Sequence, residues 1–109
     1  GLVNFSLQSG HANFVDAGNE LRAANIAGGS LGINFSSNDF VTSLQLKSPA
    51  AADVSLQSSG KVNASGVFLS NAGAGSVAGA LSLDTRQAGY LFSVPSSGGT
   101  YRGATLWGR

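Results

Sequence analysis

The stretch Gly66 to Leu83, GVFLSNAGAGSVAGALSL, decides between two folds for this chain. Its apolar run, its glycines at 73, 75 and 79 and its small residues imitate the strand, glycine turn and helix of a dinucleotide-binding unit, whose loop holds phosphate at a helix N-terminus. The continuation, ALSLDTRQAGYLFSV, alternates apolar and polar residues around the turn DTRQ and does not have the period of a helix. We therefore expect a β-hairpin, with positive φ at Gly73 and Gly75 and with Gly66 and Gly79 inside strands.

The same period of two runs through most of the chain, and no helix-length window shows a period of 3.6. Turn residues of the Gly, Pro, Asn, Asp and Ser type separate the alternating segments. The alternation predicts strands at residues 3–7, 31–35, 40–46, 54–56, 62–69, 77–83, 88–94 and 101–107. Residues 11–29, HANFVDAGNELRAANIAGG, are ambiguous, and one interpretation ends a strand at Phe14 and Val15 and places a helical turn from Glu20 to Ile26.

Strand starts about every 10 to 14 residues are typical of short antiparallel strands joined by hairpins. The expected fold is all-β: one small antiparallel barrel of about eight strands in a meander, with a sandwich as second choice. A chain of 109 residues suits a single domain, residues 1–109, with one modest core. Most aromatic residues fall on the apolar phase of the predicted strands, and we expect them to be core residues: Phe5, Phe35, Phe40, Phe68, Tyr90, Phe92 and Trp107. Trp107 is expected either to plug the end of the barrel or to show on its rim.

Composition excludes several classes of function. Charged residues make up 10% of the chain and the formal net charge is +1, so no broad electrostatic field would gather nucleic acid or anionic lipid. The chain has no cysteine, which excludes disulfides, thiolate nucleophiles and Cys-ligated zinc. No apolar run approaches the roughly 20 residues of a membrane helix, so we expect no membrane-spanning segment. No signal peptide is present at Gly1, and we expect a mature or excised chain.

Catalytic and cofactor motifs are weak throughout. His11 is the only histidine, and no acid stands at a recognisable spacing from it. None of the serines lies in a G-x-S-x-G nucleophile elbow. His11 with Tyr90 or Tyr101 offers a conceivable haem ligand pair, but we expect a polar surface histidine. We nominate no catalytic, cofactor-binding or metal-ligating residue and expect a protein that is not an enzyme and carries no cofactor.

The carboxylates are scattered instead of clustered. Three of them, Asp39, Asp53 and Asp84, stand at predicted turns, where Asp commonly accepts hydrogen bonds from its own backbone. The other two are Asp16 and Glu20. A calcium loop needs several acids at alternate positions, and this chain has no such run. We therefore interpret Asp39, Asp53 and Asp84 as turn formers.

Three stretches carry a family resemblance: GGSLGINFSSNDFVTSLQL, SSGKVNASGVFLSNAGAGSVAGALSL and AGYLFSVPSSGGTYRGATLWGR. Together they resemble the C-terminal β-barrel domain of bacterial transferrin-binding protein B and related surface lipoproteins. The matching strands are Leu31 to Phe35 and Phe40 to Leu46, followed by Gly66 to Phe68 and Gly75 to Gly79. The family's F-F-G-P turn is replaced here by LSLDTRQAGYLF, and no transferrin contact or haem ligand of the family has a matching stretch.

The resemblance implies a binding or interaction module at the cell surface, outer membrane or periplasm of a Gram-negative bacterium, with a link to iron or haem acquisition. The expected partner is another envelope protein or a host protein, and the loops Ser48 to Asp53 and Ser70 to Gly75 are expected to contact it. The alternative is a structural or sensory periplasmic domain of an envelope signalling protein, of the anti-sigma regulator type. A lipobox cysteine upstream in the full gene would favour the lipoprotein, and an upstream membrane helix would favour the regulator. The oligomeric state is left open.

Overall fold

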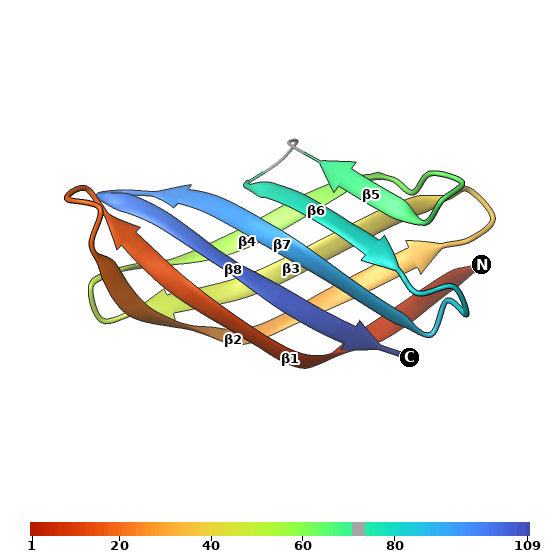
Figure 1. Cartoon of the computed structure of the whole chain (residues 1–109), viewed down its shortest axis with the longest axis horizontal. Coiled ribbons are helices and arrows are strands. Elements are labelled where there is room, and N and C mark those ends of the chain that lie inside the picture. Colours follow the sequence, from red (N-terminus) through yellow and green to blue (C-terminus); the bar gives the residue numbers. More distant parts are fainter. Residues whose placement is uncertain (71–73) are drawn as a thin grey trace.

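The computed structural model describes residues 1–70 and 74–109, and these residues contain eight strands and no helix. The all-β prediction is therefore confirmed, and the strands form one nearly closed, barrel-shaped antiparallel sheet (Figure 1). The strands are β1 (Leu2–Asp16), β2 (Leu21–Asn34), β3 (Asp39–Ser48), β4 (Ala51–Lys61), β5 (Val67–Ser70), β6 (Ser76–Leu81), β7 (Gln87–Ser96) and β8 (Gly99–Gly108).

The sheet is a meander in which the first and last strands are neighbours. The strand order is β4-β3-β2-β1-β8-β7-β6-β5, so β1 pairs with both β2 and β8, and β4 and β5 are the two edges. The edges meet at a seam that Figure 1 shows at the top of the barrel. There Gln57 and Ala74 exchange two backbone hydrogen bonds of 3.2 and 2.9 Å, and Val62 forms an isolated bridge with Phe68. A few backbone contacts, instead of a full ladder, bring the two edges together.

Apolar side chains of the inward phase fill the barrel. Leu44 and Leu56, which are register partners on β3 and β4, have no exposed surface. Trp107 is also fully buried and stacks on Tyr90 with ring centroids 5.8 Å apart, so it is a core residue and does not show on the rim. The aromatic core prediction is confirmed for Phe5, Phe40, Phe68, Tyr90, Phe92 and Trp107.

Phe35 departs from that prediction. It lies in the turn after β2, is only partly buried and packs against the edge of the core. Its ring is covered from outside by the Arg109 guanidinium, 5.8 Å from the ring centroid. A position just beyond the end of a strand no longer follows the inward phase of that strand, because the turn rotates the backbone.

The helical turn considered for Glu20 to Ile26 is wrong, because residues 21–26 form the start of β2 and Glu20 lies directly before it. A tight turn precedes them: the Asp16 carboxylate accepts hydrogen bonds from the Gly18 and Glu20 amides, and Asn19 takes a positive φ of 64°. Small residues (Ala, Gly and Ser) make up most of the segment 21–30 and none of its side chains is fully buried, so its alternation is weak. Pairing with β1 on one side and β3 on the other makes it a strand.

The predicted strand 62–69 is also wrong in its first half. Residues 63–66 form a turn in which the Asn63 side-chain oxygen accepts the Ser65 and Val67 amides, and β5 starts only at Val67. Gly66 lies in this turn with a φ of +81° and not inside a strand. Gly75 has the expected positive φ, +117°, whereas Gly73 lies outside the described residues.

Candidate functional site

The outward face of strands β5 to β8 carries apolar side chains where a solvent-facing sheet surface is normally polar. Strand register places Leu69, Ala78, Leu91 and Ala104 side by side in one row, and the row ends at His11 on β1. A second row, one pleat further along, contains Val67, Ala80, Gly89 and Leu106. We call these eight residues from β5 to β8 the apolar face.

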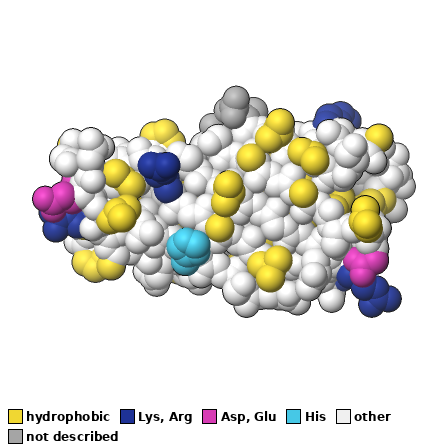
Figure 2. Space-filling model, in the orientation of Figure 1, with side chains coloured by type: hydrophobic (Ala, Val, Ile, Leu, Met, Phe, Trp, Pro, Cys, Tyr) yellow, Lys and Arg dark blue, Asp and Glu magenta, His cyan; other side chains and the backbone are white. Residues whose placement is uncertain are grey.

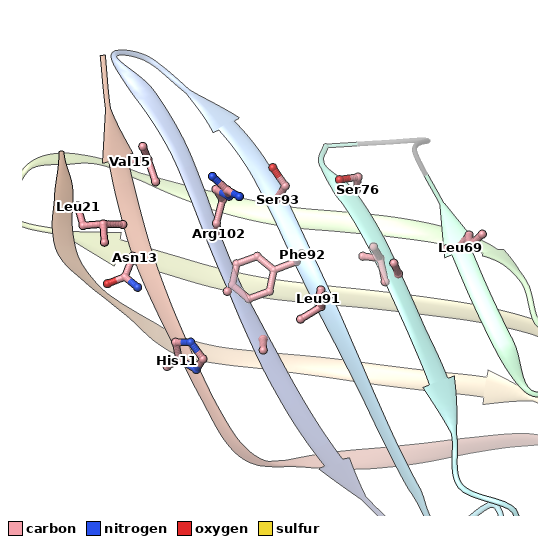
Figure 3. Close-up of a pocket in the computed structure, with 14 residues that line it drawn as sticks. His11, Asn13, Val15, Leu21, Leu69, Ser76, Leu91, Phe92, Ser93 and Arg102 are labelled. Atoms are coloured by element: carbon pink, nitrogen blue, oxygen red, sulfur yellow. The ribbon is translucent and has the colours of Figure 1, made fainter. Parts of the chain in front are cut away.

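The apolar face is exposed and hollowed. Leu69 and Leu91 are 65% and 64% exposed, and both flank the small side chain of Ala78. A shallow groove of about 650 Å³ begins here and runs across β7 and β8 toward β1 and the start of β2. Figure 2 shows hydrophobic side chains gathered over this face, with the histidine beside them. Figure 3 shows the groove wall from Leu69 to Leu21.

A polar row borders the apolar face within the groove. Register aligns Ser76, Ser93, Arg102 and Asn13 across β6, β7, β8 and β1. Arg102 stands near the middle of this row, between Asn13 and Ser93 (Figure 3). No carboxylate is found among the described residues that line the groove. The site is therefore an apolar surface with a positively charged group at its border.

Arg102 differs from the other Lys and Arg residues in having no partner among the residues that the structure describes. Arg22 pairs with Asp16 and Glu20, Lys47 with Asp53 and Lys61 with Asp39. Arg109 donates to Thr85. Arg86 lies near the Asp84 carboxylate, whose pKa is lowered by the hydrogen bond from Ser82 and then by the amide and the charge of Arg86. Within the described part of the chain, the Arg102 guanidinium makes neither an ion pair nor a hydrogen bond.

His11 and the two tyrosines lie on opposite faces of the sheet. His11 is exposed on the outer face of β1, whereas Tyr90 and Tyr101 are buried inside the barrel. The Tyr90 hydroxyl lies 2.7 Å from Thr42 Oγ1, and the Tyr101 hydroxyl donates to the Ala52 carbonyl at 2.9 Å. Burial raises the pKa of Tyr90 to about 12. His11 cannot share one haem iron with either tyrosine, because the sheet separates them.

The acids have structural roles that differ in part from the expected ones. Asp84 is a turn former as predicted, accepting from Ser82 and from the Arg86 amide. Asp39 begins β3 and Asp53 lies within β4, and each pairs with a lysine of the neighbouring strand, so the turn assignment is wrong for both. Hydrogen bonding to Lys61 lowers the pKa of the Asp39 carboxyl. Among the described residues, no group of three or more His, Cys, Asp or Glu side chains lies together.

Of the two loops expected to bind a partner, the one at Ser48 to Asp53 is shorter than predicted. Ser48 ends β3 and Ala51 begins β4, so Pro49 and Ala50 alone connect the strands, and Asp53 is already within β4. Of the segment 70–75, residues 71–73 lie outside the described residues.

The apolar face was not predicted from the sequence, although the sequence contains a signal for it: leucines 69, 91 and 106 occupy the outward phase of their strands, next to inward residues 68, 92 and 107.

Fold and site together define a small all-β barrel domain with an apolar outer face and a free arginine at its border. Comparisons of the chain with family models, with curated proteins and with solved structures found no match. The structure has no helix, within its described residues, whose length and apolar character would suit a membrane crossing.

Proposed function

We propose that this barrel is a non-enzymatic binding module of a Gram-negative cell-envelope protein, and that its ligand is another protein of the envelope or of a host. The apolar face is the observation that carries the proposal. Exposed contiguous apolar surface is costly in water and typically marks an interaction site, and Leu69 and Leu91 are each about two-thirds exposed on it.

Composition and sequence resemblance support the envelope location. A charge-poor chain rich in glycine and serine suits a β domain outside the cytoplasm. The strand motifs resemble those of the transferrin-binding protein B barrel, and from this resemblance we propose a link to iron or haem acquisition. Since His11 and the tyrosines are separated by the sheet, we place this link in protein recognition instead of haem ligation.

Fractionation of the native bacterium carrying an epitope tag on this domain tests the location. We expect the tagged protein in the outer-membrane or periplasmic fraction, and recovery with cytoplasmic marker enzymes would contradict the proposal. The purified domain should turn over no ester, glycoside, peptide or phosphate substrate, and saturable turnover that a point change abolishes would contradict the non-enzymatic role. An upstream membrane helix and cytoplasmic segment in the full gene would instead favour a sensory periplasmic domain.

A further inference from the structure

We propose that the apolar face docks a protein segment in which apolar side chains surround a carboxylate, and that Arg102 binds this carboxylate. This inference rests on the proposed binding function and names the surface and the chemistry of the partner. The surface is the apolar face together with its polar border row.

Charge complementarity specifies the acid. All five carboxylates of the chain lie in described residues, and each has its own contact elsewhere: Asp16 and Glu20 with Arg22, Asp39 with Lys61, Asp53 with Lys47, and Asp84 with Ser82. Arg102 thus offers a planar guanidinium fork with all its donors available, a geometry that matches a carboxylate in a bidentate pair. Burying that arginine under a partner without an acid would be costly, because an unpaired charge would lose its water.

The shape of the surface specifies apolar side chains around that acid. Ala78 lies between Leu69 and Leu91 in one row, and Gly89 lies between Ala80 and Leu106 in the next. These small residues form depressions between leucines, into which a large apolar side chain of the partner can pack. Arg102 is two residues from Ala104 along β8, so an acid close to such a side chain would reach it.

A second copy of this chain is a poor occupant. In a two-fold dimer each patch meets its own copy, so both Arg102 guanidinium groups would be enclosed in one interface. No acid lines the groove in the described part of the chain to offset this like charge. A different protein that brings its own carboxylate avoids the repulsion.

A small amphiphile and a membrane surface fit less well. Ligand pockets bury about 70–90% of a small molecule, whereas the walls of this groove are leucines that are themselves about two-thirds exposed. Attraction to anionic lipid needs a cluster of basic residues, and the groove contains one arginine and one histidine. A protein segment covers an open, shallow face with its own surface.

Panning a phage-displayed library of random linear peptides against the folded domain tests the inference. We expect enriched peptides to carry Asp or Glu among apolar residues. Binding of a synthetic enriched peptide should weaken roughly tenfold or more for Arg102→Gln, the loss expected for a charged hydrogen bond. Leu91→Ser should weaken peptide binding by a comparable factor, because it removes apolar contact with the peptide. Lys47→Gln and Leu2→Ser are matched controls outside the groove, with side chains that are likewise exposed, and should leave binding unchanged.

Circular dichroism of each variant confirms that it folds, and Arg102→Lys should restore part of the affinity. Two results would overturn this docking surface while the binding function stands. One is a set of enriched peptides that lack an acid. The other is peptide binding that is weakened by changes in Pro49 or Ala50 but not by changes in Arg102 and Leu91. A library that yields no saturable binder would overturn both. If the domain forms a dimer and Leu91→Ser dissociates it, the face binds a second copy of the chain. If the domain binds dodecanoate in a way that depends on Arg102 and binds no peptide, the face binds a small amphiphile. Either result would overturn the inference.

Discussion

Leu44 and Val41 lie three residues apart on β3 and face opposite sides of the sheet. Leu44 is fully buried against Leu56, whereas Val41 is 55% exposed. Replacing Leu44 with Ala should lower the free energy of unfolding by about 3 kcal/mol, because the change removes buried methyl groups and leaves a cavity. Val41→Ala is the control on the same strand and should stay within about 0.5 kcal/mol. Urea denaturation measures both, and equal losses would contradict the assigned faces.

Tyr90 and Thr42 form a buried polar contact that makes stability depend on alkaline pH. Thr42 Oγ1 donates to the Ser30 carbonyl at 2.8 Å, so the Tyr90 hydroxyl donates to Thr42. Burial raises the pKa of Tyr90 to about 12, above the ordinary value of about 10. The unfolded chain therefore releases this proton first, and the stability from Tyr90 is complete below about pH 10 and falls as the pH rises toward 12.

Urea denaturation at pH 9 and pH 11 measures this loss. For Tyr90 we expect about 1.4 kcal/mol by pH 11. Tyr90→Phe should remove that part of the pH dependence, although it should also cost stability at pH 9 because a buried hydrogen bond is lost. Burial raises the pKa of Tyr101 as well, so a smaller slope should remain in the variant. An unchanged slope in Tyr90→Phe would show that the Tyr90 phenol does not titrate as expected.

At the scale of the element, Gly79 fixes how closely β6 packs against β7 and the core. A Cβ at this position would lie 2.5 Å from the Gly89 carbonyl oxygen and 2.6 Å from the Phe68 ring. Since the oxygen belongs to the neighbouring strand, β6 would have to move. The prediction that Gly79 lies inside a strand is confirmed, since it belongs to β6.

Gly79→Ala should destabilise the protein by about 1–3 kcal/mol, the usual cost of overpacking. Gly89→Ala is the matched control on the adjacent strand. There the nearest atom to an added Cβ is the Thr105 carbonyl oxygen at 3.3 Å, a mild contact. Thermal unfolding followed by circular dichroism compares the two. A larger drop in melting temperature for Gly89→Ala would contradict this account of β6.

For the whole molecule, the seam between β4 and the strands β5 and β6 decides how far the barrel is closed. The Gln57 amide donates to the Ala74 carbonyl across the seam. In an antiparallel sheet, the amides of every second residue point to the same side of the strand, so the Ser55 amide points toward the seam like that of Gln57. Among the described residues, no backbone hydrogen bond between β4 and β6 engages the Ser55 amide. The seam is therefore joined near Gln57 and open near Ser55.

Amide hydrogen exchange followed by NMR tests this picture. We expect fast exchange at Ser55 and slower exchange at Gln57, with the strongest protection in β1 and β8, which are the central strands of the order and lie furthest from both edges. The Leu56 amide, which points toward β3, is the internal control and should be protected. Protection at Ser55 equal to that at Leu56 would show a barrel closed by a continuous ladder.

Much of this architecture follows from local pattern. Alternation at residues such as Phe40, Thr42, Leu44 and Leu46 predicts both the strand and its buried face, because side chains of a strand point alternately to the two sides of the sheet. Where side chains are small and alternation is weak, as at residues 21–30, pattern fails and pairing with neighbours decides. The candidate site was not predicted, because it consists of outward residues from five strands.

The sequence by itself determined that this protein is all-β, most of the side chains that are buried and where most turns fall, since these depend on residues close together in the chain. Only the tertiary structure decided that β1 and β8 are neighbours, that β4 and β5 are the edges, and that Arg102 forms no ion pair with any acid of the described residues. Such facts depend on register between strands distant in the chain. An arginine looks alike in sequence whether or not a carboxylate lies across the sheet, so charge pairing becomes defined only when the strands are placed side by side.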